Sequence, residues 1–214
     1  MIAIDLHTHS EGSPDGGLRL RDYARMLTSG TLQTIAITDH DDIAFAQSVQ
    51  ESLGNQIIVG EEITTKDGEL IGLFLKARIM PGLSAHETAE AIKAQDGLVY
   101  IPHPFETVRK GIAQQTLDEI AELVDIVEVH NGRAIFQNRG AIAQTWAEAH
   151  SKAMAASSDA HGKRGWGKTF SIVTEVPRQS TLVSLLKSAE LSRGTVGLRG
   201  VLYPKQNRLK RRLG

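Results

Sequence analysis

The stretch Ile2-Ala3-Ile4-Asp5-Leu6-His7-Thr8-His9 begins as a short apolar run and ends in two histidines. Residues two apart in an extended strand point to the same side, so His7 and His9 can face one cavity. Further apolar runs end in the same way, with polar groups just before the connecting loop: Asp39-His40, Glu61-Glu62, His103, Glu128-Val129-His130 and Asp159-Ala160-His161. Imidazole nitrogens and carboxylate oxygens suit borderline divalent metals, and this set exceeds the needs of one ion, which predicts two or three ions side by side.

Apolar runs alternate with amphipathic stretches along the chain. The predicted strands are Ile2–Leu6, Thr34–Thr38, Gln56–Gly60, Leu70–Leu75, Leu98–Pro102, Ile126–Val129, Ala153–Ser157 and Phe170–Thr174. The predicted helices are Leu20–Leu27, Ile43–Leu53, Ala85–Lys93, Thr116–Leu123, Arg139–His150 and Thr181–Leu191. This alternation predicts a parallel sheet covered by helices. Because ligands from distant strands converge only if the strand ends form a ring, a closed or nearly closed β/α barrel fits better than an open sheet.

Local signals refine this outline. Ser84 with Glu87 three positions later predicts a capping box at a helix start. Asp67-Gly68 predicts a hairpin turn, which would make Leu70–Leu75 an antiparallel excursion and not a step of the barrel. We expect one barrel domain over residues 1–193 and a loosely packed basic extension over residues 194–214.

Composition excludes several classes of protein and site. The 214 residues contain no cysteine, which rules out disulfides, thiolate metal sites and a cysteine nucleophile. No apolar run approaches the ~18 residues of a membrane span, so we expect no membrane partner. Asp5 and His7 interrupt any leader-like pattern at the start, and a cytoplasmic location is the default expectation. The oligomeric state is left open.

The charge is uneven along the chain. Formal net charge is −1, yet the last ten residues hold five basic residues and no acidic one: Lys205, Arg208, Lys210, Arg211 and Arg212. We expect a solvated, partly disordered end, with attraction of phosphate or nucleic acid as the alternative. No aromatic residue interleaves these charges, which disfavours a nucleic-acid partner.

Taken in order, the motifs resemble a known family. Asp-Leu-His-Thr-His-Ser at residues 5–10, Thr-Asp-His-Asp at 38–41, Gly-Glu-Glu at 60–62, Pro-His-Pro at 102–104 and Ser-Asp-Ala-His at 158–161 are similar to those of the PHP (polymerase and histidinol phosphatase) family of metal-dependent phosphoesterases. The resemblance covers roughly residues 1–175. It implies a distorted (β/α)7, TIM-like barrel that holds up to three ions, usually Mn, Fe or Zn.

The resemblance also implies a ligand set. His7, His9, Glu62 and Asp159 would hold one ion, and Glu62 would bridge to a second ion bound by His103 and His130. Asp15, His40 and His161 would hold a third ion, and Asp15 favours a harder ion or weaker occupancy there. Glu62, Asp159 and His161 are the expected catalytic residues. Either Glu61 or Glu62 could bridge, and the family pattern Gly-x-Glu favours Glu62. Asp39 and Glu61 would instead orient ligand imidazoles.

Such a centre predicts hydrolysis. Adjacent dications lower the pKa of a shared water enough to give hydroxide near neutral pH, and they clamp phosphoryl oxygens. Arg133, Arg164 and Lys168 follow ligand-bearing strands and are candidates for binding substrate phosphate, with Arg133 the best placed.

We therefore expect a metal-dependent phosphoesterase acting on a small phosphomonoester or nucleotide-like substrate. Two alternatives are an accessory, non-catalytic PHP module and a metal-dependent amide or lactone hydrolase. Only 40 residues separate Glu62 from His103, so the pocket should be open and without an inserted covering domain. His86 and His150 lie in predicted helices and should be dispensable.

Overall fold

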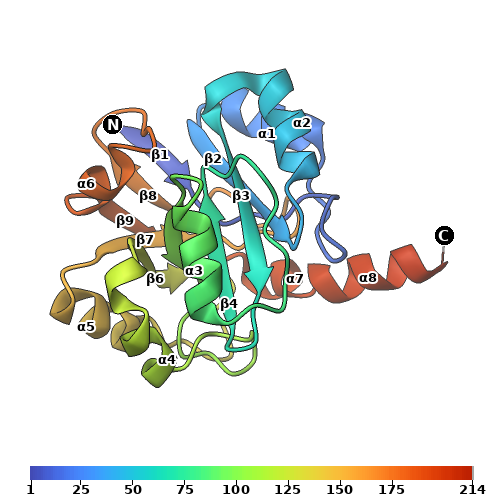
Figure 1. The fold of residues 1–214 in the computed structure, drawn as a ribbon. Helices are drawn as coiled ribbons and strands as arrows, with labels where there is room; N and C mark the ends of the chain where they lie inside the picture. Colours follow the sequence, from blue (N-terminus) through green and yellow to red (C-terminus); the bar gives the residue numbers. More distant parts are fainter. Residues whose placement is uncertain (214) are drawn as a thin grey trace.

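The computed structural model describes residues 1–213, and its strands form one curved sheet (Figure 1). Across the sheet the order is β7-β6-β5-β4-β3-β2-β1-β8-β9. In chain order the strands are β1 (Ile2–Asp5), β2 (Thr34–His40), β3 (Ile57–Thr64), β4 (Glu69–Leu73), β5 (Leu98–Ile101), β6 (Ile126–Asn131), β7 (Ala153–Ser157), β8 (Thr169–Val173) and β9 (Glu190–Arg193). Neighbours pair in parallel from β1 to β3 and from β5 to β7, while β4, β8 and β9 each pair antiparallel with their neighbours.

The sheet curves until its β7 end meets β8. The Ser171 hydroxyl on β8 accepts the N–H of Ala156 on β7 at 3.0 Å and donates to the carbonyl of the same residue at 3.2 Å. These bonds replace part of a backbone ladder and leave a nearly closed barrel. The prediction of a single, distorted α/β barrel domain is thereby confirmed.

The helices lie outside the strands (Figure 1). They are α1 (Leu20–Thr28), α2 (Ala44–Leu53), α3 (Ala85–Lys93), α4 (Gln114–Glu119), α5 (Gly140–Ala149), α6 (Leu182–Leu186), α7 (Gly197–Val201) and α8 (Tyr203–Leu213). Strand alternation divides the core: Ile35 and Ile37 pack outward against helices, whereas Ala36 packs into the barrel interior. Leu182 and Leu186 of α6 belong to the inner cluster, so this short helix packs its leucines against the barrel core.

Most predicted elements are present, with three differences. The Ser84–Glu87 capping box starts α3 as expected. The Leu70–Leu75 run pairs antiparallel after the Asp67-Gly68 turn as predicted, but it is not an excursion from the barrel: it forms β4, which lies within the sheet between β3 and β5. The end of the predicted helix Thr181–Leu191 is instead occupied by β9, which pairs with β8. The C-terminal segment, expected to be loosely packed, forms α7 and α8.

Among residues 1–213, no helix is both long enough and apolar enough to cross a bilayer.

Candidate metal centre

The two histidines that follow β1 point into the barrel mouth. Their Nε2 atoms lie 3.1 Å apart, and both rings are fully buried. Thr8 between them bridges to Ala160, which brings the segment containing Asp159 alongside. Asp159 Oδ1 lies 3.5 Å from His9 Nε2 and 3.7 Å from His7 Nε2. The expected group of His7, His9 and Asp159 therefore converges on one point.

Glu62 lies between four imidazoles. Its Oε1 is 3.1 Å from His103 Nε2, and its Oε2 is 3.1 Å from His9 Nε2, 3.4 Å from His7 Nε2 and 3.3 Å from His40 Nδ1. Each oxygen thus faces a different set of nitrogens, which is the arrangement a bridging carboxylate requires.

The neighbouring Glu61 side chain faces away from this cavity. Its Oε2 accepts the N–H of Ile79 at 2.8 Å, and burial raises its pKa to about 7. Alternation along β3 therefore places Glu62, and not Glu61, at the centre.

A third group lies on the other side of His9. Asp15 Oδ1 is 3.5 Å from His161 Nε2 and 3.7 Å from His40 Nε2. Although burial would raise the pKa of Asp15, contact with His161 and the charges of His9 and His40 hold it below its usual range. Burial, helped by His9 and Arg133, lowers the pKa of His161 to about 3, so its ring is neutral at physiological pH, the form that binds a metal.

These residues fit divalent ions. Potential ligand atoms lie within 4.8 Å of one another in four groups: His9, Asp15, His40 and His161; His7, Glu62 and His103; His7, His9 and Asp159; and His40, Glu62 and Glu69. His161 Nε2 is buried and has no hydrogen-bond partner among the described residues. A buried nitrogen without a hydrogen-bond partner, 3.5 Å from a carboxylate oxygen, is a ligand pair that a divalent ion would satisfy. The nitrogen and oxygen donors suit borderline cations.

Glu69 was missed by the sequence analysis. It begins β4 and is 6% exposed, with Oε1 4.0 Å from His40 Nδ1 and Oε2 4.0 Å from His103 Nε2. Burial, followed by the charge of Glu62, raises the pKa of Glu69 to about 8. The only sequence signal was an acidic residue next to the Asp67-Gly68 turn, which gave no reason to place it in the barrel.

His130 is not brought to the other ligands, which contradicts its expected role. Its Nε2 lies 2.9 Å from the carbonyl oxygen of Gly194. The register of β6 against β7 shifts between Glu128 and His130, a β-bulge that breaks the alternation of faces. As a result Glu128 and Asn131 face the barrel interior, joined by a 2.8 Å hydrogen bond, while His130 points elsewhere.

Glu128 supports the centre from beneath. It accepts Tyr100 OH at 2.9 Å and the backbone N–H of His103 at 2.7 Å, and its Oε1 lies 3.1 Å from His7 Nδ1. Glu128 thus has the imidazole-orienting role that we expected of Asp39 and Glu61. Asp39 instead accepts the backbone N–H and hydroxyl of Ser10, so its predicted contact with an imidazole is wrong.

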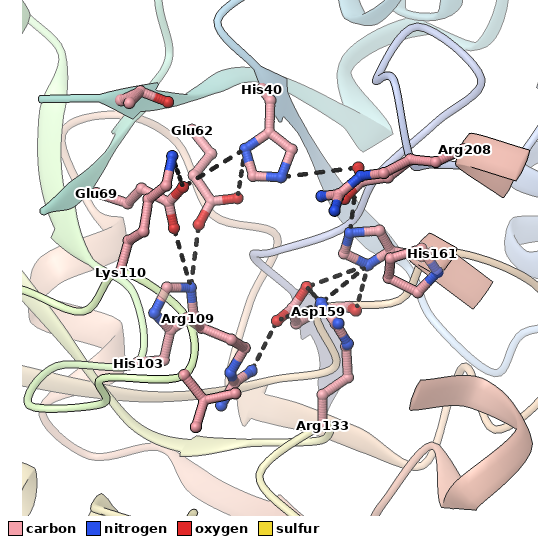
Figure 2. Close-up of a pocket in the computed structure, with 14 residues that line it drawn as sticks. His40, Glu62, Glu69, His103, Arg109, Lys110, Arg133, Asp159, His161 and Arg208 are labelled. Carbon is pink, nitrogen blue, oxygen red and sulfur yellow. Dashed lines mark hydrogen bonds and ion pairs between the residues drawn. The ribbon is translucent and has the colours of Figure 1, made fainter. Parts of the chain in front are cut away.

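Basic side chains lie around the cavity, which has a volume of about 340 Å³ and is shown in Figure 2. Arg109 Nη1 donates to Asp159 Oδ2 at 2.8 Å, and Arg133 Nη1 lies 3.1 Å from Asp159 Oδ1. Lys110 and Arg208 complete the basic lining. Arg133 is where the sequence predicted it, whereas Arg109, Lys110 and Arg208 were missed.

The other two predicted phosphate-binding residues lie elsewhere. Arg164 and Lys168 are exposed and do not line this cavity.

Known proteins share sequence similarity with this chain. A model of the PHP domain matches residues 5–181. The chain is 31% identical over 150 residues to the uncharacterized protein MJ1587 of Methanocaldococcus jannaschii, a match that covers 64% of this chain and 88% of the relative.

Solved structures share the fold. A two-domain protein from Bacteroides vulgatus, described as containing a predicted PHP-like metal-dependent phosphoesterase, is similar with a TM-score of 0.67 and 17% identity, over 97% of this chain and 63% of that one. This chain therefore spans less than two thirds of that protein. An amidohydrolase from Chromobacterium violaceum, with bound sulfate and no metal, has a TM-score of 0.56 and 14% identity, over 74% of this chain and 87% of that one.

Proposed function

Since the chain belongs to the PHP domain family, we propose that it is a metal-dependent phosphoesterase that hydrolyses a small phosphomonoester or nucleotide-like substrate. The observation that carries this proposal is the position of Glu62 between four imidazoles, next to a cavity that Arg109 and Arg133 line. Candidate metal ligands that lie beside the guanidinium groups of Arg109 and Arg133 suit a negatively charged substrate.

The residues fall into sets that would hold two or three divalent ions such as Mn, Fe or Zn. His7, His9 and Asp159 would hold one ion, His103 would hold a second, and Asp15, His40 and His161 would hold a third, with Glu62 available to more than one of them. When bound, such ions make water a better nucleophile and offset the charge that develops on phosphoryl oxygens. Burial opposes ionisation of Glu62, yet His7 and His40 hold its pKa well below the usual range, so it stays an anionic ligand.

The positively charged side chains that line the cavity would orient the substrate. Arg133 Nε is buried without a hydrogen-bond partner among the described residues, so this guanidinium has donor capacity left. Arg109 is held by Glu106 and Asp159, which fixes its position at the cavity wall. Lys110 at the rim has a side chain that is 66% exposed and can attract an anion from solvent. Charge-assisted bonds from guanidinium groups match the geometry of phosphoryl oxygens.

A panel of substrates tests the proposal. Protein loaded with Mn²⁺ should hydrolyse p-nitrophenyl phosphate or a nucleotide, and EDTA should abolish this hydrolysis. A bis-ester, a p-nitroanilide and a lactone in the same panel separate other reactions from this one. Turnover of the anilide or lactone without any phosphate ester would favour the amide or lactone alternative. Metal binding without turnover of any compound would favour an accessory module.

A further inference from the structure

The C-terminal helix α8 contacts the candidate ligands of the third group through two consecutive residues. The Asn207 amide donates to the backbone carbonyls of Asp15 at 2.9 Å and His161 at 3.1 Å. Arg208 Nη2 donates to Asp15 Oδ2 at 2.6 Å, and Figure 2 shows its side chain reaching the cavity beside His161. One helix turn therefore joins two ligand-bearing loops that are almost 150 residues apart in the sequence.

Both loops are shaped to receive this helix. A Cβ atom on Gly17 would lie 2.9 Å from Asn207 Nδ2, and one on Gly162 would lie 2.7 Å from the ring of Tyr203. Pro204 is buried and lines the same cavity as Arg208. Because side chains at either glycine would push the helix away, this docking depends on close approach and is not a loose surface contact.

The contacts determine how Asp15 presents its carboxylate. Arg208 occupies Oδ2, which leaves Oδ1 facing His40 and His161. The Asp15 loop has little other regular structure, since its closest strand-like contact is the isolated bridge between Ser10 and Leu18. The Arg208 side chain is 59% exposed, so solvent screens the repulsion between its charge and a nearby cation.

We propose that α8 is a positioning element for the ion held by Asp15, His40 and His161, and that helix docking and binding of this ion strengthen each other. The inference uses the ligand assignment of the proposed function but not the identity of the substrate. Coupling between two binding events is reciprocal. If docking of α8 raises the affinity for the ion by some factor, binding of the ion raises the equilibrium constant for docking by the same factor. Partners that orient metal ligands typically change affinity by about 10–100-fold.

Titration of the metal-free, full-length protein with Mn²⁺, followed by calorimetry, tests this coupling. Asn207→Ala should lower the affinity for one Mn²⁺ ion about tenfold and leave the affinities for the other ions unchanged. Arg212→Ala is the matched control: this exposed residue on the same helix has no polar contact among the described residues, and its removal should change nothing. In wild type, Mn²⁺ should slow hydrogen exchange across residues 203–213, and Asn207→Ala should lose that effect.

A second variant distinguishes loss of the helix contact from a folding defect. Gly17→Ala displaces the Asn207 amide without removing it, and it should weaken the same ion. Circular dichroism without metal checks that each variant is folded. Equal Mn²⁺ affinities in wild type, Asn207→Ala and Gly17→Ala, with helix exchange unaffected by Mn²⁺, would overturn the inference while leaving the proposed function intact. Absence of Mn²⁺ binding in wild type would overturn both, and absence of phosphatase activity alone would overturn only the proposed function.

Discussion

Glu128 Oε1 lies 3.1 Å from His7 Nδ1, on a ring whose Nε2 faces Glu62 and Asp159. A carboxylate behind a ligand imidazole fixes its tautomer and orientation, and it raises the basicity of the nitrogen that faces the metal. This pair therefore links the interior of the barrel to the proposed metal centre.

Glu128→Gln should weaken Mn²⁺ binding about 10–100-fold, because an amide cannot accept from all the donors that now surround the carboxylate. Calorimetric titration measures the affinity. The variant should also lower the free energy of unfolding by about 1–3 kcal/mol, since buried donors lose their acceptor. Unchanged Mn²⁺ affinity in a folded Glu128→Gln protein would contradict the orienting role.

Substituting His9 by alanine should abolish turnover of a phosphate ester, because the His9 ring faces Glu62, Asp159 and His161. His7→Ala and Asp159→Ala should do the same.

His150→Ala is the matched control, since its ring stacks on Trp146, with ring centroids 4.0 Å apart, away from the cavity. His86, whose side chain is 58% exposed, should be equally dispensable. Thermal unfolding must accompany the assays, because losing an ion also removes stability. Equal loss of activity in His150→Ala and His9→Ala would refute the site.

The sequence was informative where the strand pattern and the ligand chemistry agreed. Regular alternation placed His7 with His9, as the structure has them. The family pattern Gly-x-Glu, and not alternation, favoured Glu62 over Glu61, and Glu62 is the residue that faces the histidines. The prediction for His130 was wrong because a β-bulge reverses the side to which this residue points. No residue in its own segment indicates that bulge.

Long-range contacts limited the rest of the prediction. Glu69 was missed because nothing local shows that β4 inserts into the sheet. The docking of Asn207 on Asp15 joins opposite ends of the chain, and a basic stretch without aromatic residues gave no sign of it. The basic end, expected to be solvated and partly disordered, instead contacts Asp15 and His161 through α8.

Arg133→Ala should raise KM for a phosphate ester by about 10-fold or more, since a charge-assisted hydrogen bond contributes about 1.5–3 kcal/mol. Steady-state kinetics at saturating Mn²⁺ gives the comparison. Lys168→Ala removes an exposed positive charge outside the cavity and should leave KM unchanged. If both variants raised KM equally, general attraction of the substrate, and not a specific contact, would explain the effect.

The pH dependence of stability should reveal Glu61. Burial raises its pKa from 4.5 to about 7, so the folded state holds this proton more tightly than the unfolded chain. The stability that this bound proton on Glu61 contributes to the folded state is fully present below pH 4.5 and is lost as pH rises through about 7.

Relative to wild type, metal-free Glu61→Gln should therefore gain up to about 3 kcal/mol in free energy of unfolding across that interval. Urea unfolding at several pH values provides the measurement. Glu51→Gln, on the exposed face of α2, should follow the wild-type profile. A constant difference between Glu61→Gln and wild type at all pH values would show that Glu61 does not titrate in this way.

The number of ions bound per chain tests the central claim most directly. Metal-free protein is dialysed to equilibrium against Mn²⁺, analysed for bound metal, and assayed with p-nitrophenyl phosphate in the same samples. We predict at least two ions per chain, with hydrolysis appearing as the ions bind and disappearing with EDTA. One ion or fewer per chain at saturation, or hydrolysis that does not depend on bound Mn²⁺, would contradict the account.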